Sequence, residues 1–360
     1  MADRTATPIE AGARVAHRGR GRRRLTAVGA ALAATVALAG CTLPGNRPAP
    51  SAGGPSTTPT TIAGPSTTAP PTTTATPVGG DCRSTATTGS ATLTSSGAAR
   101  SFVVSVPSTG GRHPIVLDLH GLGSSGPAEA AWTKLGERGA ARGAVVIEPS
   151  ALGSPAMWKL PPILGTSDKT FVEDLIAWAG TNACGDTGRV AIAGISNGAA
   201  LTGALSCQLA GMVDAVGMVA GPNAWRPCTD QAPVPVLAFH GTADPIIPYA
   251  GGPVFGGMQG GLGARSGSGL RVAPAEQAMA GWAQRNGCST TPTTAAVSAH
   301  VSRLSYEGCR DGADTALYRI DGGGHTWPGA APIPGNPFGP TTDEISATTL
   351  LLDFFEAHWH

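Results

Sequence analysis

The pentapeptide Gly194-Ile195-Ser196-Asn197-Gly198 is the feature that most constrains the fold of this chain. It follows the apolar run 190–193 and precedes an Ala- and Leu-rich stretch with helical periodicity. G-x-S-x-G between a strand and a helix is the pattern of a sharp turn that exposes its serine. The two glycines remove side chains that would collide with the strand and the helix. The sequence therefore predicts that Ser196 is presented as a nucleophile.

Strand and helix patterns alternate along most of the chain. Apolar runs predict strands at 102–106, 114–119, 144–147, 190–193, 213–220, 234–239 and 316–320. Helical patterns fall between most of them, at about 127–141, 170–182, 198–210, 274–286 and 343–357. This alternation predicts an α/β fold with a mostly parallel, doubly wound sheet and helices on both faces. The very Gly-rich segment 251–269 is predicted to be a mobile loop.

An acid and a base follow two of the later strands. Asp244 comes shortly after the strand at 234–239, although Asp-Pro is also common turn chemistry, so a cap is the alternative for Asp244. His325 follows the strand at 316–320 and three glycines that let its imidazole approach another loop. The other histidines considered as the base lack this setting: His113, His240, His300, His358 and His360. The order Ser196, Asp244, His325 is the nucleophile–acid–histidine order of α/β-hydrolases, which predicts that fold and a catalytic triad.

The loop at 119–125, Leu-His-Gly-Leu-Gly-Ser-Ser, follows another predicted strand and is the expected oxyanion loop. The expected donors are the backbone N–H groups of Leu122 and of Asn197, the residue after the nucleophile. Each such donor is typically worth about 3–4 kcal/mol of transition-state stabilisation. His120 is expected to shape the loop rather than to take part in the chemistry.

Three tryptophans are candidate substrate contacts, because an aromatic ring can stack on a sugar or feruloyl ring or pack against a polyester. They are Trp158, Trp225 and Trp327. The alternative for each is packing in the core or at the rim. His358-Trp359-His360 is interpreted as a frayed C-terminus rather than a metal site. No cofactor or metal is expected, since a triad and backbone donors suffice for ester hydrolysis and no C-x-x-C pair is present.

These motifs together resemble the polyhydroxybutyrate depolymerase/feruloyl esterase group of α/β-hydrolases, including its actinobacterial lipoprotein esterases. The resemblance covers about residues 98–330. It rests on Leu119-His120-Gly121, the Ser196 pentapeptide, His240-Gly241-Thr242-Ala243-Asp244-Pro245-Ile246-Ile247-Pro248-Tyr249, Trp282-Ala283-Gln284-Arg285-Asn286-Gly287-Cys288 and Gly323-Gly324-His325-Thr326-Trp327-Pro328-Gly329. It implies Ser196 as nucleophile, Asp244 as acid and His325 as base. Members often have Cys where this chain has Leu122, and the insertion at 251–269 is also atypical of the group.

The N-terminal residues predict export. Residues 18–24 are basic, and residues 25–38 are apolar but too short to span a bilayer comfortably. Leu38-Ala39-Gly40-Cys41 resembles a lipobox, in which the cysteine is lipidated and begins the mature protein. The alternative is an ordinary secretion signal, and Arg22-Arg23 is a weak twin-arginine candidate. Residues 1–40 are therefore assigned to a lipoprotein-type signal peptide.

Residues 41–80 are predicted to be a disordered linker, and residues 81–360 an esterase domain. Pro, Thr and Ser make up 23 of the 39 positions at 42–80, a composition that cannot bury a core. Six cysteines follow Cys41, which implies disulfides in an exported chain. Sequence proximity favours the first two of the following pairs, and the third is the remainder. The pairs are Cys288–Cys309, Cys207–Cys228 and Cys82–Cys184.

The leading interpretation is a secreted or surface-anchored serine esterase that forms an acyl-enzyme with a polyester or with feruloyl or acetyl sugar esters. Alternatives are an acyltransferase of cell-envelope sugars of the mycolyltransferase kind, a non-catalytic surface binding module and, more weakly, a peptidase. From Cys41 onward the chain has 17 basic and 21 acidic residues, which gives no basic face for nucleic acid. Membrane contact is expected only through a lipid anchor at Cys41, and no obligate protein partner is implied.

Overall fold

The computed structural model describes residues 82–360 apart from 162, 226–227, 229–231, 257–269, 334 and 336. The predicted signal peptide, linker and lipidation at Cys41 lie outside the described residues. Within the described part of the chain, no helix is long and apolar enough to cross a membrane.

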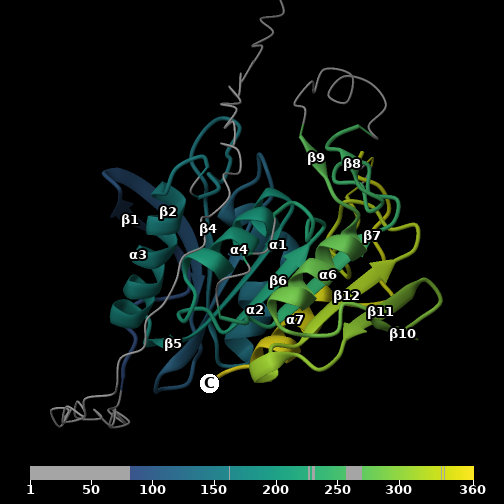
Figure 1. The fold of residues 1–360 in the computed structure, drawn as a ribbon. Coiled ribbons are helices and arrows are strands. Elements are labelled where there is room, and N and C mark those ends of the chain that lie inside the picture. Colours follow the sequence, from purple (N-terminus) through teal and green to yellow (C-terminus); the bar gives the residue numbers. More distant parts are fainter. Residues whose placement is uncertain are drawn as a thin grey trace, which may run out of the picture. The chain divides into compact units, whose positions relative to one another are not determined.

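A ten-stranded sheet runs through the domain in the order β1-β2-β4-β3-β5-β6-β7-β12-β11-β10 (Figure 1). The six strands from β4 to β12 pair in parallel, and the two strands at each edge pair antiparallel. The predicted mostly parallel sheet is therefore confirmed. The strands are β1 (Gly89–Ser95), β2 (Ala98–Ser105), β3 (His113–Leu119), β4 (Val145–Pro149), β5 (Gly185–Ile195), β6 (Ala215–Val219), β7 (Val236–Gly241), β10 (Thr293–Ala296), β11 (Val301–Tyr306) and β12 (Thr315–Ile320).

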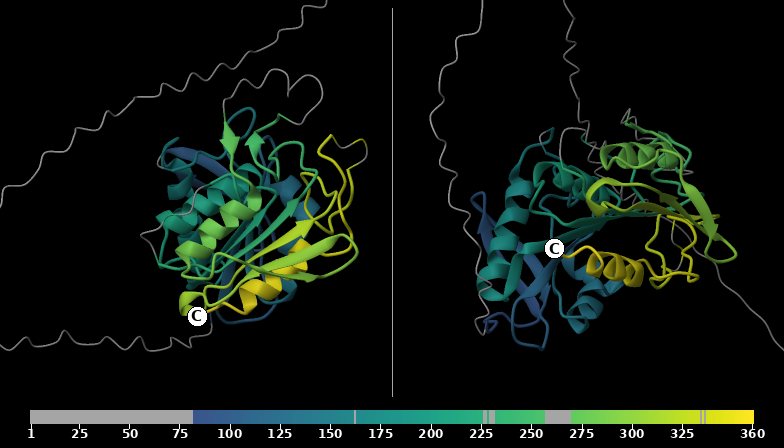
Figure 2. Two further views of the ribbon diagram at one scale, coloured as in Figure 1. Left: turned by 45° about the vertical axis from the view of Figure 1, so that its right-hand side comes forward. Right: turned by 60° about the horizontal axis from the view of Figure 1, so that its bottom comes forward.

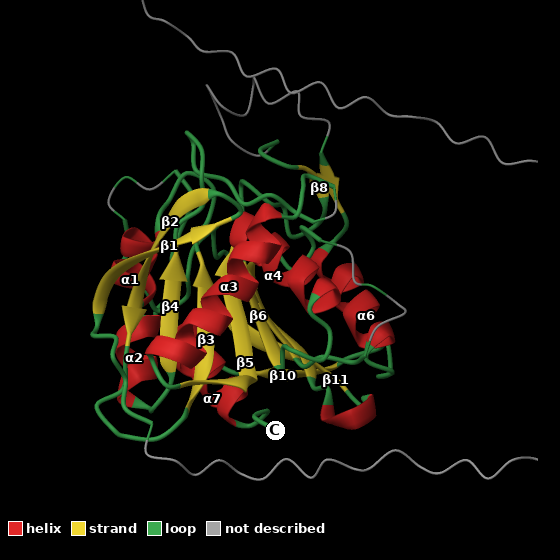
Figure 3. Cartoon of the chain, turned by 90° about the vertical axis from the view of Figure 1, so that its left-hand side faces the viewer, coloured by secondary structure: helices red, strands yellow, loops and turns green. Residues whose placement is uncertain are grey.

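Helices cover both faces of this sheet, as predicted (Figures 2 and 3). They are α1 (Gly126–Thr133), α2 (Leu135–Ala141), α3 (Ser167–Asn182), α4 (Asn197–Gln208), α6 (Ala275–Arg285) and α7 (Ala347–Glu356). Alternate residues of one strand face opposite sides: Ile115 and Leu117 pack with α3, α4 and α6, whereas Val116 packs with α2 and α7. The right-hand view of Figure 2 shows α6 in green and α7 in yellow on opposite sides of the sheet.

Three local features differ from the predictions. The helix predicted at 127–141 is two helices, because Lys134 between α1 and α2 adopts a left-handed conformation with φ of 57°. The edge strands β1, β10 and β11 were not predicted. A small ribbon at the base of the Gly-rich segment was also not predicted, since β8 (Gly252–Pro253) pairs with β9 (Arg271–Val272), whereas the predicted mobile loop lies mostly outside the described residues, at 257–269.

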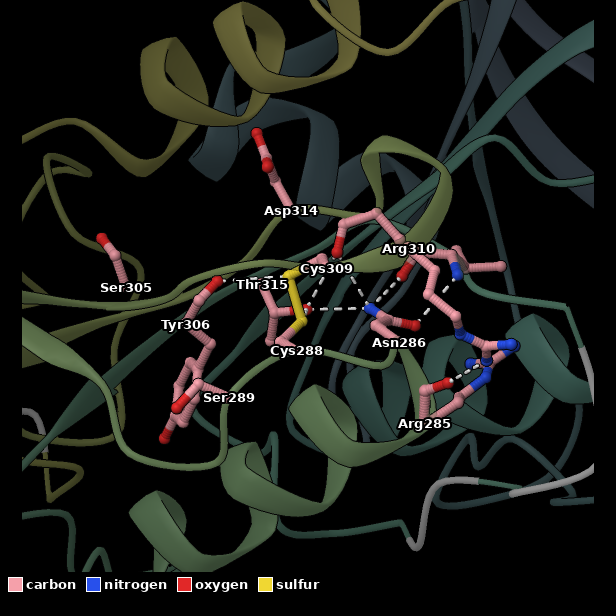
Figure 4. Close-up of a disulfide and its surroundings, with 12 residues drawn as sticks. Arg285, Asn286, Cys288, Ser289, Ser305, Tyr306, Cys309, Arg310, Asp314 and Thr315 are labelled. Carbon is pink, nitrogen blue, oxygen red and sulfur yellow. Dashed lines mark hydrogen bonds between the residues drawn. A yellow bond between two sulfur atoms is a disulfide. The ribbon is translucent and has the colours of Figure 1, made fainter.

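The structure contains the three predicted disulfides, Cys82–Cys184, Cys207–Cys228 and Cys288–Cys309. Figure 4 shows the last of them beside Asn286, at the amino end of β12. The buried Asn286 amide donates to Val234 O and to Thr315 Oγ1, each at 2.8 Å. It thereby ties the end of α6 to the strands β7 and β12. The 282–288 motif thus anchors these strands at the end opposite to the residues described next.

Candidate active site

Ser196 occupies a strained turn between β5 and α4. Its backbone has φ of 59° and ψ of −118°, a conformation that non-glycine residues adopt rarely and mainly at functional sites. A Cβ atom at Gly198 would lie 1.9 Å from Leu119 O, and one at Gly194 would lie 2.7 Å from the Gly198 carbonyl carbon. Only glycine fits at either position, which explains why the turn needs both.

Asp244 and His325 meet at the carboxyl ends of β7 and β12. The His325 Nδ1 atom lies 2.8 Å from Asp244 Oδ2, and both side chains are buried. The loops that carry them are in direct contact, since a Cβ atom at Gly241 would lie 2.2 Å from Gly323 O. Ser196 follows β5 at the same edge of the sheet, with β6 between β5 and β7. The fold therefore brings the predicted acid and base together at the edge of the sheet where the half-buried Ser196 lies.

The Asp244 carboxylate is surrounded by hydrogen-bond donors. Oδ1 accepts from the N–H groups of Ile246 at 2.8 Å and Ile247 at 2.9 Å. Oδ2 accepts from His325 and also from His240 Nε2, at 3.2 Å. Burial acts to raise the pKa of Asp244, but the hydrogen bonds and charge of the two histidines outweigh it and hold that pKa well below its ordinary value. The ionised carboxylate keeps the His325 proton on Nδ1 and leaves Nε2 as the basic nitrogen.

His240 is a part of this site that the sequence reasoning set aside. Its Nε2 faces two acceptors, Ile247 O at 2.9 Å as well as Asp244 Oδ2, so Nε2 carries the proton. The side chain is buried near the end of β7, four residues before Asp244. The signal available in the sequence was this spacing across the turn that follows the strand.

The loop after β3 lies against Ser196. A Cβ atom at Gly121 would be 3.4 Å from Ser196 Cβ. The loop is held by hydrogen bonds from Gly123 N to Ala156 O at 2.8 Å and from Ser124 N to Gly121 O at 3.2 Å. In the described part of the chain, neither Leu122 N–H nor Asn197 N–H donates a hydrogen bond to another residue. The role of these two N–H groups as oxyanion donors stays a prediction.

The prediction that Trp158 and Trp327 contact the substrate is wrong, because both side chains are buried. Trp158 and Trp327 have no exposed surface, so neither can touch a substrate in this structure. The Trp327 indole donates to Thr348 Oγ1 at 3.0 Å and packs with α7. Trp225 is half-buried beside α4, where its Cβ would lie 3.1 Å from a Cβ atom at Gly203.

The C-terminus also differs from the expected frayed end, because His358 is buried and its Nδ1 lies 2.7 Å from Phe354 O.

His120 has the shaping role that was predicted. Its Nε2 accepts from Ala151 N–H at 3.0 Å, so the proton is on Nδ1, which donates to Gly121 O at 2.7 Å. Burial lowers the pKa of His120, in keeping with a neutral ring that accepts at Nε2. The ring joins the loop at 119–125 to the segment that follows β4.

Two esterases are similar to this chain in sequence. Feruloyl esterase B of Piromyces equi is 27% identical over 241 residues, which are 63% of this chain and 42% of that protein. The bifunctional acetylxylan esterase/xylanase XynS20E of Neocallimastix patriciarum is 30% identical over 154 residues, 42% of this chain and 22% of that protein. The chain thus spans less than half the length of these curated relatives. No family model matches the chain.

Among solved structures, the acetyl xylan esterase from Aspergillus awamori superposes with a TM-score of 0.50. The match covers 74% of this chain and 98% of that one, at 14% sequence identity. The chain has the α/β-hydrolase fold. The predicted fold class is therefore confirmed by the sheet order together with this superposition.

Proposed function

We propose that this protein is a serine carboxylic ester hydrolase with Ser196 as nucleophile, Asp244 as acid and His325 as base. The observation that carries the proposal is the Asp244–His325 hydrogen bond of 2.8 Å, which lies at the same edge of the sheet as the strained Ser196 turn. A serine hydroxyl is a weak nucleophile until a base within reach removes its proton. An imidazole oriented by a buried carboxylate is the usual base for this task.

The reaction would follow two acyl-transfer steps. His325 Nε2 takes the Ser196 proton as Oγ attacks the ester carbonyl, and the carbonyl oxygen becomes an oxyanion that accepts from Leu122 N–H and Asn197 N–H. The imidazolium gives its proton to the departing alcohol, which leaves an acyl-serine. Water, deprotonated by His325, then attacks the acyl-serine and releases the acid and the free enzyme. Asp244 stabilises the imidazolium in both steps.

Acylated sugars are the proposed substrate class, since the relatives that match are a feruloyl esterase and an acetylxylan esterase. Apolar side chains beside the oxyanion loop favour an aromatic acyl group. Leu122, Leu152 and Met157 are exposed by 43%, 47% and 43%, on segments joined by the Gly123–Ala156 and Met157–Leu152 hydrogen bonds. The three disulfides suit an extracellular protein, so we propose export, with a lipid anchor at Cys41.

The first test replaces the nucleophile. Ser196→Ala is expected to lower kcat for p-nitrophenyl butyrate by about 10⁴-fold or more, in line with triad deletions in other serine hydrolases. Circular dichroism and thermal unfolding of the variant show whether the fold is kept. A variant that retains more than a tenth of the wild-type activity would remove Ser196 from this role.

A substrate panel then tests the class of ester. Methyl ferulate, acetylated xylan and polyhydroxybutyrate are compared, and p-nitrophenyl ferulate and acetate are compared after each rate is divided by its alkaline hydrolysis rate. Preference for the feruloyl ester supports an aromatic acyl group, whereas preference for polyhydroxybutyrate contradicts it. A sugar acceptor added to the assay separates transfer from hydrolysis, because a transferase gives acylated sugar in place of free acid.

A further inference from the structure

Trp158 lies between the two halves of the proposed oxyanion site. It belongs to the segment between β4 and α3, outside any helix or strand, and it is wholly buried. One half of the site is the Ser196 turn with Asn197, and the other half is the loop from His120 to Leu122. These two halves follow the neighbouring strands β3 and β5, whose pairing ends at Leu119 and Gly194, so the positions of the loops beyond these residues depend on further contacts.

The Trp158 main chain holds the Asn197 side chain. Asn197 Oδ1 accepts from Trp158 N–H at 2.7 Å, and Asn197 Nδ2 donates to Trp158 O at 3.4 Å. The amide side chain is thus bound at both of its polar atoms by one residue. Because Asn197 is also the first residue of α4, this pair of bonds fixes where the Asn197 N–H lies.

The Trp158 indole holds the other half. Its Nε1–H donates to His120 O at 2.8 Å, and the two rings lie 4.9 Å apart between centroids. The His120 carbonyl belongs to the peptide unit that leads into Gly121 and Leu122. This bond therefore sets the orientation of the loop just before the second proposed donor.

We propose that Trp158 is a positioning residue that fixes the spacing of the two oxyanion donors, Leu122 N–H and Asn197 N–H. The inference rests on the proposed function of Ser196. Donors placed in advance stabilise the negative charge that forms on the carbonyl oxygen, and they act mainly on the transition state rather than on the bound ester. Loss of the Trp158 contacts should therefore lower kcat and leave KM nearly unchanged.

Trp158→Phe tests this role, because it keeps the aromatic ring and removes the indole N–H. The matched control is Trp282→Phe: Trp282 is also wholly buried, and its Nε1 donates to a backbone carbonyl, Pro222 O, at 3.3 Å, but among the described residues no hydrogen bond joins its side chain to residues 120–125. Both variants lose one buried N–H···O=C bond. Both are therefore expected to unfold at a lower temperature than the wild type.

Kinetics should separate the two variants. For Trp158→Phe we expect kcat with p-nitrophenyl butyrate to fall by about 10- to 100-fold, a part of the effect of removing an oxyanion donor. KM should change by less than about threefold. A trifluoromethyl ketone forms an oxyanion when the serine adds to its carbonyl, so its affinity should fall by about the same factor as kcat. Trp282→Phe should keep kcat and inhibitor affinity within about threefold. Equal kinetic losses in the two variants, or an unchanged Trp158→Phe, would overturn the proposal.

Asn197→Ala provides a second line of evidence that survives a folding failure of Trp158→Phe. It removes the other pair of bonds, and we expect the same fall in kcat and in ketone affinity. In the double variant the two losses should not add, since each substitution removes one of the two connections through which Trp158 fixes the same donor spacing. Additive losses would contradict a shared role. Ser196→Ala is measured beside them: activity that survives it contradicts the proposed function, whereas an inactive Ser196→Ala with a fully active Trp158→Phe contradicts only the role of Trp158.

Discussion

Two groups of buried carboxyl side chains in this domain have opposite surroundings, apart from Asp168, which is paired with Arg100. Asp244 accepts hydrogen bonds from two backbone N–H groups and two imidazoles. The second group is Asp118 on β3, Glu148 on β4 and Glu129 on α1, all with less than 2% of their surface exposed. Thr133 Oγ1 donates to Asp118 Oδ2 at 2.9 Å, but Asp118 Oδ1 and Glu129 Oε1 have no hydrogen-bond partner among the described residues.

The pKa of each of these carboxyl groups depends on how many hydrogen-bond donors surround it. Burial raises the pKa of Asp118 to about 7, with a smaller opposing effect of the Thr133 hydrogen bond. Burial, reinforced by the charge of Asp118, raises the pKa of Glu148 to about 8. Burial and the charges of Asp118 and Glu148 also raise that of Glu129 well above its ordinary value. Asp244 is buried too, yet its pKa is lowered, so donors rather than burial decide which carboxyl group is an anion.

The difference assigns different work to the two groups. The Asp244 carboxylate is a permanent charge that can stabilise an imidazolium. The Asp118 group is largely protonated in mildly acidic solution, and it packs α1 and α2 onto β3 and β4. Glu148 lies so close to α2 that a Cβ atom at Gly136 would be 2.4 Å from its Oε1.

The largest expected effect is on catalysis, at Asp244. Asp244→Asn should lower kcat by about 10³- to 10⁴-fold, because the amide neither carries the charge nor holds the His325 proton on Nδ1. The matched change in the other group, Asp118→Asn, should keep kcat at pH 7 within about fivefold, since that carboxyl group is not among the reacting residues. Steady-state rates with p-nitrophenyl butyrate check both. Comparable losses of kcat in the two variants would contradict the different roles of Asp244 and Asp118.

The second effect is on stability, and its sign differs between the groups. Asp118 and Glu148 stabilise the fold while they are protonated, because folding raises their pKa values. This contribution is complete below their unfolded pKa near 4 and is lost as the pH rises through their folded pKa values of about 7 and 8. From pH 6 to pH 9 the free energy of unfolding should therefore fall by about 4 kcal/mol. Asp244 acts the other way, because its contribution is present above pH 4 and is lost on acidification.

Urea unfolding at several pH values, with the disulfides intact, measures this dependence. Glu148→Gln keeps the shape of the side chain and removes its titration, so the fall between pH 6 and pH 9 should be smaller in that variant. A wild-type stability that is constant or rises over this range would show that the Asp118 group is not protonated in the folded protein.

The smallest expected effect is at His240, which sharpens the description of Asp244. His240→Leu removes one donor to Oδ2, and kcat should fall by about tenfold, the usual scale of one hydrogen bond to a charged group. His240→Gln places an amide N–H near the position of Nε2 and should restore most of the activity. A glutamine variant as slow as the leucine variant would indicate that the imidazole only fills space.

The sequence predicted the parts of the fold that depend on local patterns. Apolar runs predicted the parallel strands, and glycines that only a tight turn requires predicted the Ser196 turn. The order of residues after successive strands suggested Asp244 and His325 as partners, because parallel strands place such loops at one edge of the sheet. Sequence proximity and elimination were enough for the three disulfide pairs.

What the sequence could not supply is contact between segments that are distant along the chain. Trp158 was interpreted as a substrate contact, yet its indole bonds to His120, 38 residues earlier, and its main chain to Asn197, 39 residues later. Asp118, Glu129 and Glu148 belong to three separate elements, and only the packing of α1 on the sheet makes them neighbours. The break at Lys134 depends on one backbone conformation within a continuous helical pattern.

The most direct test of the central claim is the mass of the protein after reaction with a fluorophosphonate ester. We predict a single adduct per chain that peptide mapping places on Ser196, that is absent in Ser196→Ala and that forms far more slowly in Asp244→Asn. An adduct on another residue, or no adduct while the protein hydrolyses esters, would contradict the assignment of Ser196 as the nucleophile.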